Sequence, residues 1–192
     1  MNKKVLKVGL DLDGVILYNP ARIFRPVIST AKRLVLHKNK DKVNFYIPKT
    51  RMEKIIWFWI HKSSIFPAAG FKDFLQASKN KDIELYIITA RFSFLKNDFE
   101  HWLHKIGAPA HVAGWFYNKH DEQPHIYKEK KIKELGLDYF VDDNWDIVRK
   151  LNASGVKTTV IWIYNLFDKS IEYAHKVPSL SEAFRKIQRE RK

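Results

Sequence analysis

The sequence contains no cysteine among its 192 residues. This absence excludes disulfide bonds, thiolate metal sites and cysteine nucleophiles, and it fits a reducing compartment, so we expect a cytoplasmic protein. A long apolar run is also missing. The basic start Met1-Asn2-Lys3-Lys4 precedes an apolar stretch that Lys7 and Asp11 interrupt before a signal-peptide core could form. No run reaches the ~20 apolar residues of a membrane span, so no membrane association is expected.

Acidic residues are scarce, at 21 against 35 lysines and arginines, which gives a formal net charge of +14. The basic residues are spread along the chain, and this balance favours anionic partners such as phosphorylated small molecules or nucleic acid. A solvated basic surface would explain the same balance. Hydrophobic residues make up 45% and aromatic residues 14% of the sequence, which indicates a folded globule of one core with room for a small insert.

Strand and helix patterns alternate along most of the chain. Apolar runs predict strands at 5–10, 83–88, 110–116, 138–141 and 157–163, and apolar spacings of three and four predict helices at 20–37, 50–62, 71–80, 95–106, 127–135, 145–153 and 179–189. This alternation is typical of the α/β class, with a Rossmann-like parallel sheet and helices on both faces. We expect residues 1–17 and 67–192 to form the core and residues 18–66 to form a mostly helical insert after the first strand.

The most informative stretch is the first strand, which ends in two acids, Asp11 and Asp13, followed by Gly14. Side chains two apart in an extended segment point to the same side. Both carboxylates can therefore address one volume at the carboxyl end of the strand, where open α/β sheets bind ligands. One acid could act as a nucleophile while the other transfers a proton, and both could help to hold Mg²⁺. An ordinary polar turn is the alternative.

Three later positions suit the same chemistry. Thr89 follows an apolar strand and can offer a hydroxyl group to a phosphate oxygen, while Lys128 stands near a helix start and can reach an anion. Asp142 and Asp143 follow a third apolar strand. Because four carboxylates at one site would repel one another, the pattern favours a bound cation such as Mg²⁺.

These features occur in a fixed order: Asp11-Leu12-Asp13-Gly14-Val15, then Ile87-Ile88-Thr89-Ala90-Arg91, then a lysine, then Val141-Asp142-Asp143-Asn144. In this order they resemble the four signatures of the haloacid dehalogenase (HAD) superfamily of phosphohydrolases. The long gap between the first two signatures is similar to the inserted helical cap of that superfamily's first cap class.

Within the superfamily, three further stretches look like the 5'(3')-deoxyribonucleotidase-like group: Trp102-Leu103, Leu135-Gly136-Leu137-Asp138 and Tyr164-Asn165. The insert shows no such agreement, so the substrate of that group does not carry over.

The resemblance implies a role for each signature residue. Asp11 would be the nucleophile, Asp13 the general acid and base, and Lys128 the group that neutralises charge on nucleophile and phosphate. The expected substrate-binding residues of the core are Thr89, Ala90 and Arg91, and the expected Mg²⁺ site consists of Asp11, Asp13, Asp142 and Asp143. Lys128 is chosen because it stands eight residues before Gly136, a spacing similar to that of the family; its neighbours Lys130, Lys131 and Lys133 remain alternatives.

The helix expected at 50–62 adds a prediction about specificity. At about 100° per residue, one stripe carries Met52, Ile55, Ile56, Trp59 and Ile60, which we assign to the interior of the insert. Trp57 and Phe58 project to the other side, among basic residues. We expect them to bind substrate by stacking on a base or another flat group, the alternative being that this face packs on the core or on another subunit.

The sequence thus predicts a Mg²⁺-dependent HAD-type phosphatase, 5'-nucleotidase-like, that hydrolyses a small phosphate monoester through an aspartyl-phosphate. A nucleotide is the leading substrate class. One alternative, motivated by the charge of +14, is a phosphatase that acts on nucleic-acid ends, with binding that weakens in salt. The other is a non-catalytic binding protein that retains the fold. The sequence makes no prediction of the oligomeric state.

Overall fold

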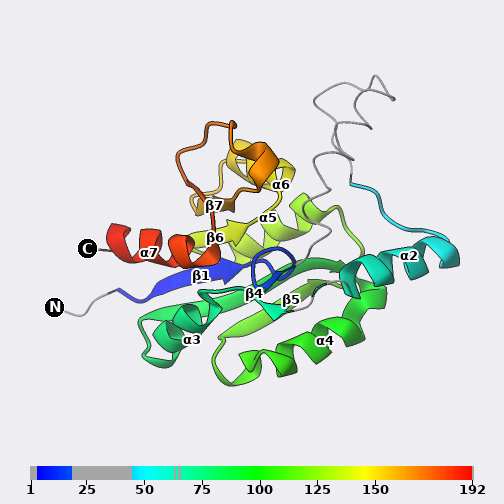
Figure 1. The fold of residues 1–192 in the computed structure, drawn as a ribbon, viewed down its shortest axis with the longest axis horizontal. Helices are drawn as coiled ribbons and strands as arrows, with labels where there is room; N and C mark the ends of the chain where they lie inside the picture. Colours follow the sequence, from blue (N-terminus) through cyan, green and yellow to red (C-terminus); the bar gives the residue numbers. More distant parts are fainter. Residues whose placement is uncertain (1–3, 19–44, 63, 65, 192) are drawn as a thin grey trace.

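The computed structural model describes residues 4–18, 45–62, 64 and 66–191, and its centre is a sheet of six parallel strands in the order β5-β4-β1-β6-β7-β8 (Figure 1). The strands are β1 (Leu6–Leu10), β4 (Ile83–Phe92), β5 (Gly114–Asn118), β6 (Tyr139–Asp142), β7 (Thr159–Ile163) and β8 (Lys176–Val177). Because all neighbours run parallel, their carboxyl ends meet at one edge of the sheet.

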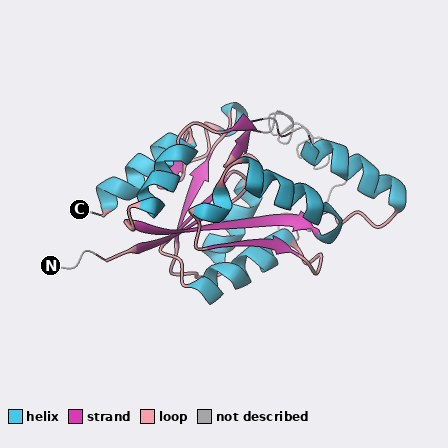
Figure 2. Ribbon diagram, turned by 90° about the horizontal axis from the view of Figure 1, so that it is seen from below, coloured by secondary structure: helices cyan, strands magenta, loops and turns pink. Residues whose placement is uncertain are grey.

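Helices cover both faces of this sheet (Figure 2). One face packs against α3 (Phe71–Lys79), α4 (Lys96–Lys105) and α7 (Leu180–Glu190), and the other against α5 (Pro124–Leu135) and α6 (Trp145–Ala153). Successive strand residues alternate between the two apolar clusters: Val141 belongs to the first and Phe140 to the second, as the two-residue period of a strand requires. The predicted α/β class, with a parallel sheet between two helical layers, is confirmed.

Two predicted strands differ from the observed ones. The strand predicted at 83–88 continues to Phe92, because β5 supplies a hydrogen-bonding partner as far as Asn118, with a register shift between Thr89 and Phe92. The strand predicted at 110–116 begins only at Gly114, since a short 3-10 helix, Ala108–Ala110, contains Pro109 and occupies the chain before it. The shift in β4 is a bulge, a feature that re-aims side chains next to functional sites.

The predicted insert is described only in part, because its expected helix at 20–37 lies outside the described residues. Its second helix, α2 (Arg51–Lys62), has nearly the predicted bounds. The two ends of the insert are joined by a two-stranded antiparallel ribbon of β2 (Leu17–Tyr18) and β3 (Phe66–Pro67), which is too short to leave a periodic signal in the sequence. The division into a core and a cap at these positions stays a prediction.

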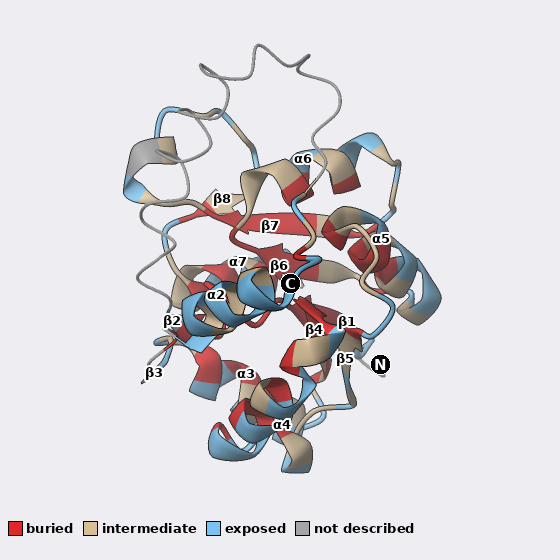
Figure 3. Cartoon of the chain, turned by 90° about the vertical axis from the view of Figure 1, so that its right-hand side faces the viewer, coloured by how far each residue is buried: buried red, intermediate tan, exposed pale blue. Residues whose placement is uncertain are grey.

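Helix α2 lies beyond the end toward which β1 points, and in Figure 3 it stands in front of the sheet. Its stripe of large apolar side chains, predicted to form an interior, is exposed in the described part of the protein; the five residues are Met52, Ile55, Ile56, Trp59 and Ile60. Among the described residues, no helix combines the length and the apolar character needed to cross a membrane.

Candidate active site

The carboxyl ends of three adjacent strands bring the signature residues together. Asp11 follows β1 directly, Asp142 is the last residue of β6, and Thr89 lies in β4. Strand β1 lies between β4 and β6, and the backbone N–H of Asp11 donates to the carbonyl oxygen of Val141 at 3.0 Å. Three stretches that are far apart in the sequence therefore meet at one point of the sheet edge.

Three carboxylates form a buried cluster at this point. Asp11, Asp142 and Asp143 each offer one oxygen, and these oxygens lie within 4.8 Å of one another. Gly14 makes room for the third of them: a Cβ at Gly14 would lie 2.3 Å from Oδ2 of Asp143, and its φ of +83° suits glycine. The Asp-x-Asp-Gly pattern thus needs its glycine for the close approach of a carboxylate from another strand.

Lys128 neutralises part of this acidic cluster. Its Nζ lies 2.7 Å from Oδ2 of Asp142 and 3.1 Å from Oδ2 of Asp11, with only 1% of the side chain exposed. Burial alone would lower the pKa of the Lys128 ammonium, but Asp11 and Asp142 raise it above its ordinary value. Lys128 is therefore charged in the structure and lies between the two carboxylates.

The other three lysines of α5 do not lie at the cluster. Lys130, Lys131 and Lys133 pair with glutamates at the surface, with Glu122, Glu134 and Glu129 respectively. Of the four candidates, Lys128 alone contacts Asp11.

The residues present fit a divalent cation. Burial, followed by repulsion from Asp142, Asp143 and Asp13, raises the pKa of Asp11 to about 8, although Lys128 acts in the opposite direction. A cation among these oxygens would relieve that repulsion, and a set of carboxylate oxygens is the donor set that Mg²⁺ takes. The cluster found among the described residues contains three of the four expected ligands and does not include Asp13.

The carboxylate of Asp13 is held by Arg91 instead. Nε of Arg91 lies 2.8 Å from Oδ2 of Asp13, and Nη2 lies 2.8 Å from Oδ1. Nη1 of Arg91 donates to Asp98 at 2.6 Å, and the hydroxyl group of Ser64 donates to Oδ1 of Asp13 at 3.1 Å. Burial lowers the pKa of Arg91, but Asp13 and Asp98 outweigh it and raise that pKa.

The predicted substrate-binding residues of β4 differ in exposure. Thr89 is buried at 1% exposure, and its hydroxyl oxygen accepts a hydrogen bond from the backbone N–H of Arg91 at 3.3 Å. Ala90 is partly exposed. The Arg91 side chain has no exposed area, so its guanidinium group contacts carboxylates rather than open space.

The predicted aromatic pair of the insert lies on the half-buried side of α2. The ring of Trp57 is 5.8 Å from that of Tyr46, and Nζ of Lys62 lies 5.3 Å from the ring centre of Phe58. Helix α2 also reaches the core, since Nζ of Lys54 lies 5.8 Å from the ring of Phe94. The side of α2 that carries this pair is thus near the short 3-10 helix, Ser93–Leu95, that follows β4.

Three residues at the site were not predicted from the sequence. Ser64 and Asp98 contact Asp13 and Arg91 as described, and the indole N–H of buried Trp162 donates to the backbone oxygen of Asp143 at 3.2 Å. Asp98 stands in the first turn of α4, where an acid is favourable for any helix. That ordinary position gives no sign of a contact with the site.

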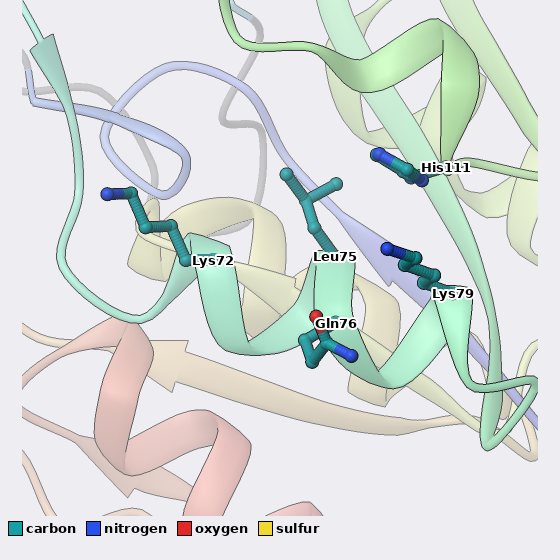
Figure 4. A pocket seen from close by; sticks show the side chains of 5 residues that line it. All are labelled: Lys72, Leu75, Gln76, Lys79 and His111. Atoms are coloured by element: carbon teal, nitrogen blue, oxygen red, sulfur yellow. The ribbon is translucent and has the colours of Figure 1, made fainter.

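Two surface hollows lie away from the acidic cluster. One runs along α3 and is lined by Lys72, Leu75, Gln76, Lys79 and His111 (Figure 4). The other is at the opposite edge of the sheet, where Asp138, Gly136 and Gly155 are among its lining residues. Neither is lined by Lys128 or by a residue of the acidic cluster.

No family model matches the sequence, and no curated protein matches it either. Solved structures do match. A HAD hydrolase of family IA, variant 3, from Entamoeba histolytica has a TM-score of 0.60 and 13% identity, covering 93% of this chain and 95% of that one. YfnB from Bacillus subtilis, assigned as a HAD-hydrolase and bound to magnesium, has a TM-score of 0.60 and 12% identity, covering 97% of this chain and all of that one.

CbbY from Rhodobacter sphaeroides, solved in complex with phosphate, has a TM-score of 0.59 and 13% identity, covering 93% of this chain and 96% of that one. Matches at such low identity establish the fold. They do not separate the nucleotidase-like group from other groups, so that finer assignment stays a prediction. The α/β fold of this chain, with its six-stranded parallel sheet between helical layers, is that of HAD-superfamily hydrolases.

Proposed function

We propose that this protein is a Mg²⁺-dependent phosphatase that hydrolyses a small phosphate monoester. The observation that carries the proposal is the buried group formed by Lys128 with Asp11, Asp142 and Asp143. Such a group costs free energy to bury, so it is hard to explain as a purely structural feature. The fold adds support, since one similar structure is bound to magnesium and another is in complex with phosphate.

In the first half of the proposed reaction, a carboxylate oxygen of Asp11 attacks the phosphorus atom. The bond between phosphorus and the leaving oxygen breaks, and Asp13 gives a proton to that oxygen. Thr89 binds a phosphoryl oxygen, and Lys128 neutralises charge on Asp11 and on the phosphate. Bound Mg²⁺ supplies further neutralisation of negative charge at the phosphoryl group.

In the second half, water attacks the phosphorus atom of the aspartyl-phosphate and gives a proton to Asp13. The bond between phosphorus and Asp11 breaks, which releases inorganic phosphate and restores the Asp11 carboxylate and the protonated Asp13. Hydrolysis of phosphate monoesters is among the slowest uncatalysed reactions, with enzymatic accelerations of up to ~10²¹-fold. Positioning and charge neutralisation account for most catalysis of this type, which is consistent with the number of buried charges at the site.

We further propose a nucleotide as the substrate, with Trp57 and Phe58 stacking on its base. Support comes from the position of α2 in front of the sheet, from its contact with Phe94, and from the partial burial of both rings. The surrounding basic residues would attract the phosphate group.

A panel of phosphate monoesters, assayed for phosphate release with Mg²⁺ and with a chelator, tests this function. We expect Mg²⁺-dependent release, greatest with nucleotides. An oligonucleotide with a terminal phosphate belongs in the panel, since faster release from it, with strong salt dependence, would favour the nucleic-acid substrate. A purified, folded protein that hydrolyses no member of the panel would contradict the proposal.

A further inference from the structure

We propose that Arg91 is a positioning residue for Asp13, and that its planar guanidinium group fixes the orientation of the carboxylate that transfers the proton. The inference rests on the proposed function, because Asp13 has this role only in phosphoryl transfer. In this proposal Arg91 orients Asp13, whereas the sequence predicts that Arg91 binds the substrate directly.

The contact between the two groups has the geometry that fixes a carboxylate. Two N–H groups of Arg91 donate to the two oxygens of Asp13, both at 2.8 Å. Such a paired contact sets the plane of the carboxylate as well as its distance. A lysine at this position could match the charge, but it would lack the planar pair of donors.

Arg91 is itself held in place from a second side. Its Nη1 donates to Asp98 of α4 at 2.6 Å, and its side chain has no exposed area. The backbone of Arg91 lies within the register shift of β4, and its N–H donates to the hydroxyl oxygen of Thr89 at 3.3 Å. The guanidinium group is therefore fixed by the core, independently of any substrate.

The contact with Asp98 also explains how Arg91 can stay buried beside Asp13, whose charge changes during the proposed reaction. Asp13 gives up a proton in one step of the proposed reaction and regains one in the next. A buried arginine that had Asp13 as its sole partner would be uncompensated whenever Asp13 is neutral, at considerable cost. The second carboxylate, 2.6 Å away, keeps Arg91 compensated in both states.

Backbone hydrogen bonds fix the turn that contains Asp13, whereas its side chain is held by Arg91 and by the hydroxyl group of Ser64. The backbone around it is fixed, since the N–H of Gly14 donates to the carbonyl oxygen of Leu17 at 2.8 Å. This bond does not set rotation about the side-chain bonds of Asp13. A displacement of a catalytic group by about 1 Å can cost on the order of 10²-fold in rate. A guanidinium group that holds the Asp13 carboxylate in place should therefore increase the rate of proton transfer.

The test compares two leaving groups. p-Nitrophenolate leaves readily without a proton, whereas the alkoxide of ethyl phosphate needs one from Asp13. In Arg91→Met we expect kcat to fall about 10²-fold with ethyl phosphate and less than about tenfold with p-nitrophenyl phosphate, with KM nearly unchanged. Arg91→Lys should recover only part of the loss. Arg185→Met, at an exposed arginine of α7 paired with Glu182, should leave both activities unchanged.

The double variant Arg91→Met/Asp98→Asn guards against misfolding, because it removes the charge of Asp98, one of the two carboxylates that Arg91→Met deprives of the arginine. Thermal unfolding shows which variants are folded. A folded variant that loses equal activity on both substrates, or none on either, would overturn the inference while the proposed function stands. A folded wild-type protein that hydrolyses neither these two substrates nor any other member of the monoester panel would overturn the proposed function and the inference with it.

Discussion

Lys128 donates a hydrogen bond of 2.7 Å to Asp142, and both side chains are buried, at 1% and 0% exposure. The two residues come from different elements, α5 and β6, so they meet only when helix α5 packs on the sheet. The remaining acids of the cluster leave it with an excess of negative charge, which is the physical basis for expecting a cation there.

Replacing Lys128 tests this charge balance. Lys128→Met breaks a buried ion pair, so we expect a loss of about 3–5 kcal/mol in the free energy of unfolding and a fall of about 10²–10³-fold in kcat. Added Mg²⁺ should recover part of the stability, which thermal unfolding measures. Lys130→Met is the matched control, because Lys130 is 62% exposed and surface pairs contribute about 0–1 kcal/mol. Equal effects of the two variants would contradict the assigned role.

Gly14 and Gly107 form a second matched pair. Both have positive φ, +83° and +68°, but a Cβ would contact Asp143 at Gly14 and nothing within 4 Å at Gly107. Alanine at either position should cost about 1–2 kcal/mol in stability from backbone strain. Gly14→Ala should in addition displace the Asp143 carboxylate and weaken Mg²⁺ binding, as measured by calorimetry. Unchanged Mg²⁺ affinity in Gly14→Ala would show that Asp143 does not contribute to the metal site.

Mg²⁺ binding should depend on pH through Asp11. Because the pKa of Asp11 is raised to about 8 in the metal-free protein, its protonated form dominates below that pH, and the carboxylate must lose its proton to bind the cation. Affinity should therefore rise as pH increases toward 8 and level off above it. Calorimetry in buffers of different ionisation enthalpy should show release of about one proton per Mg²⁺ at about pH 6.5 and almost none at about pH 9. No proton release at the lower pH would exclude Asp11 as the linked group.

Specificity should depend on the aromatic pair of α2. Base stacking contributes roughly 1–3 kcal/mol, so Trp57→Ala or Phe58→Ala should lower kcat/KM for the preferred nucleotide by about 5–150-fold and affect p-nitrophenyl phosphate far less. Met52→Ala is the control, since Met52 is 69% exposed and lies about 120–140° around the helix from Trp57 and Phe58. Equal losses on the nucleotide and on p-nitrophenyl phosphate would exclude base stacking by these rings.

Much of the fold could be predicted because its signals are local. Apolar periodicity located most core helices and strands to within a few residues, and the acids after β1 and β6 marked the correct edge of the sheet. The extension of β4 to Phe92 depends on pairing with β5, and two-residue strands such as β2 and β8 carry too little pattern to be recognised. These features are set by contacts between distant segments.

The candidate site likewise contains residues that local sequence signals could place and residues whose contacts depend on distant segments. Asp11 and Asp142 could be placed together from strand ends, because parallel strands share one edge, whereas Lys128 was selected by its spacing to Gly136, which resembles that of the HAD superfamily. The contacts of Asp13 could not be predicted, since they join residues 78 positions apart in the sequence, in a turn and in an irregular stretch of β4. Ser64 shows the same limit: its hydrogen bond to Asp13 joins residues that no sequence motif connects.

The most direct test of the central claim is phosphate release by wild type and Asp11→Asn, assayed in parallel on the best monoester of the panel, with Mg²⁺ and with a chelator. We predict turnover by the wild type that a chelator abolishes and added Mg²⁺ restores. We predict no turnover by Asp11→Asn, together with a thermal unfolding transition that shows an intact fold. Turnover that survives either the chelator or the loss of the Asp11 carboxylate would contradict a mechanism in which Asp11 is both the nucleophile and a metal ligand.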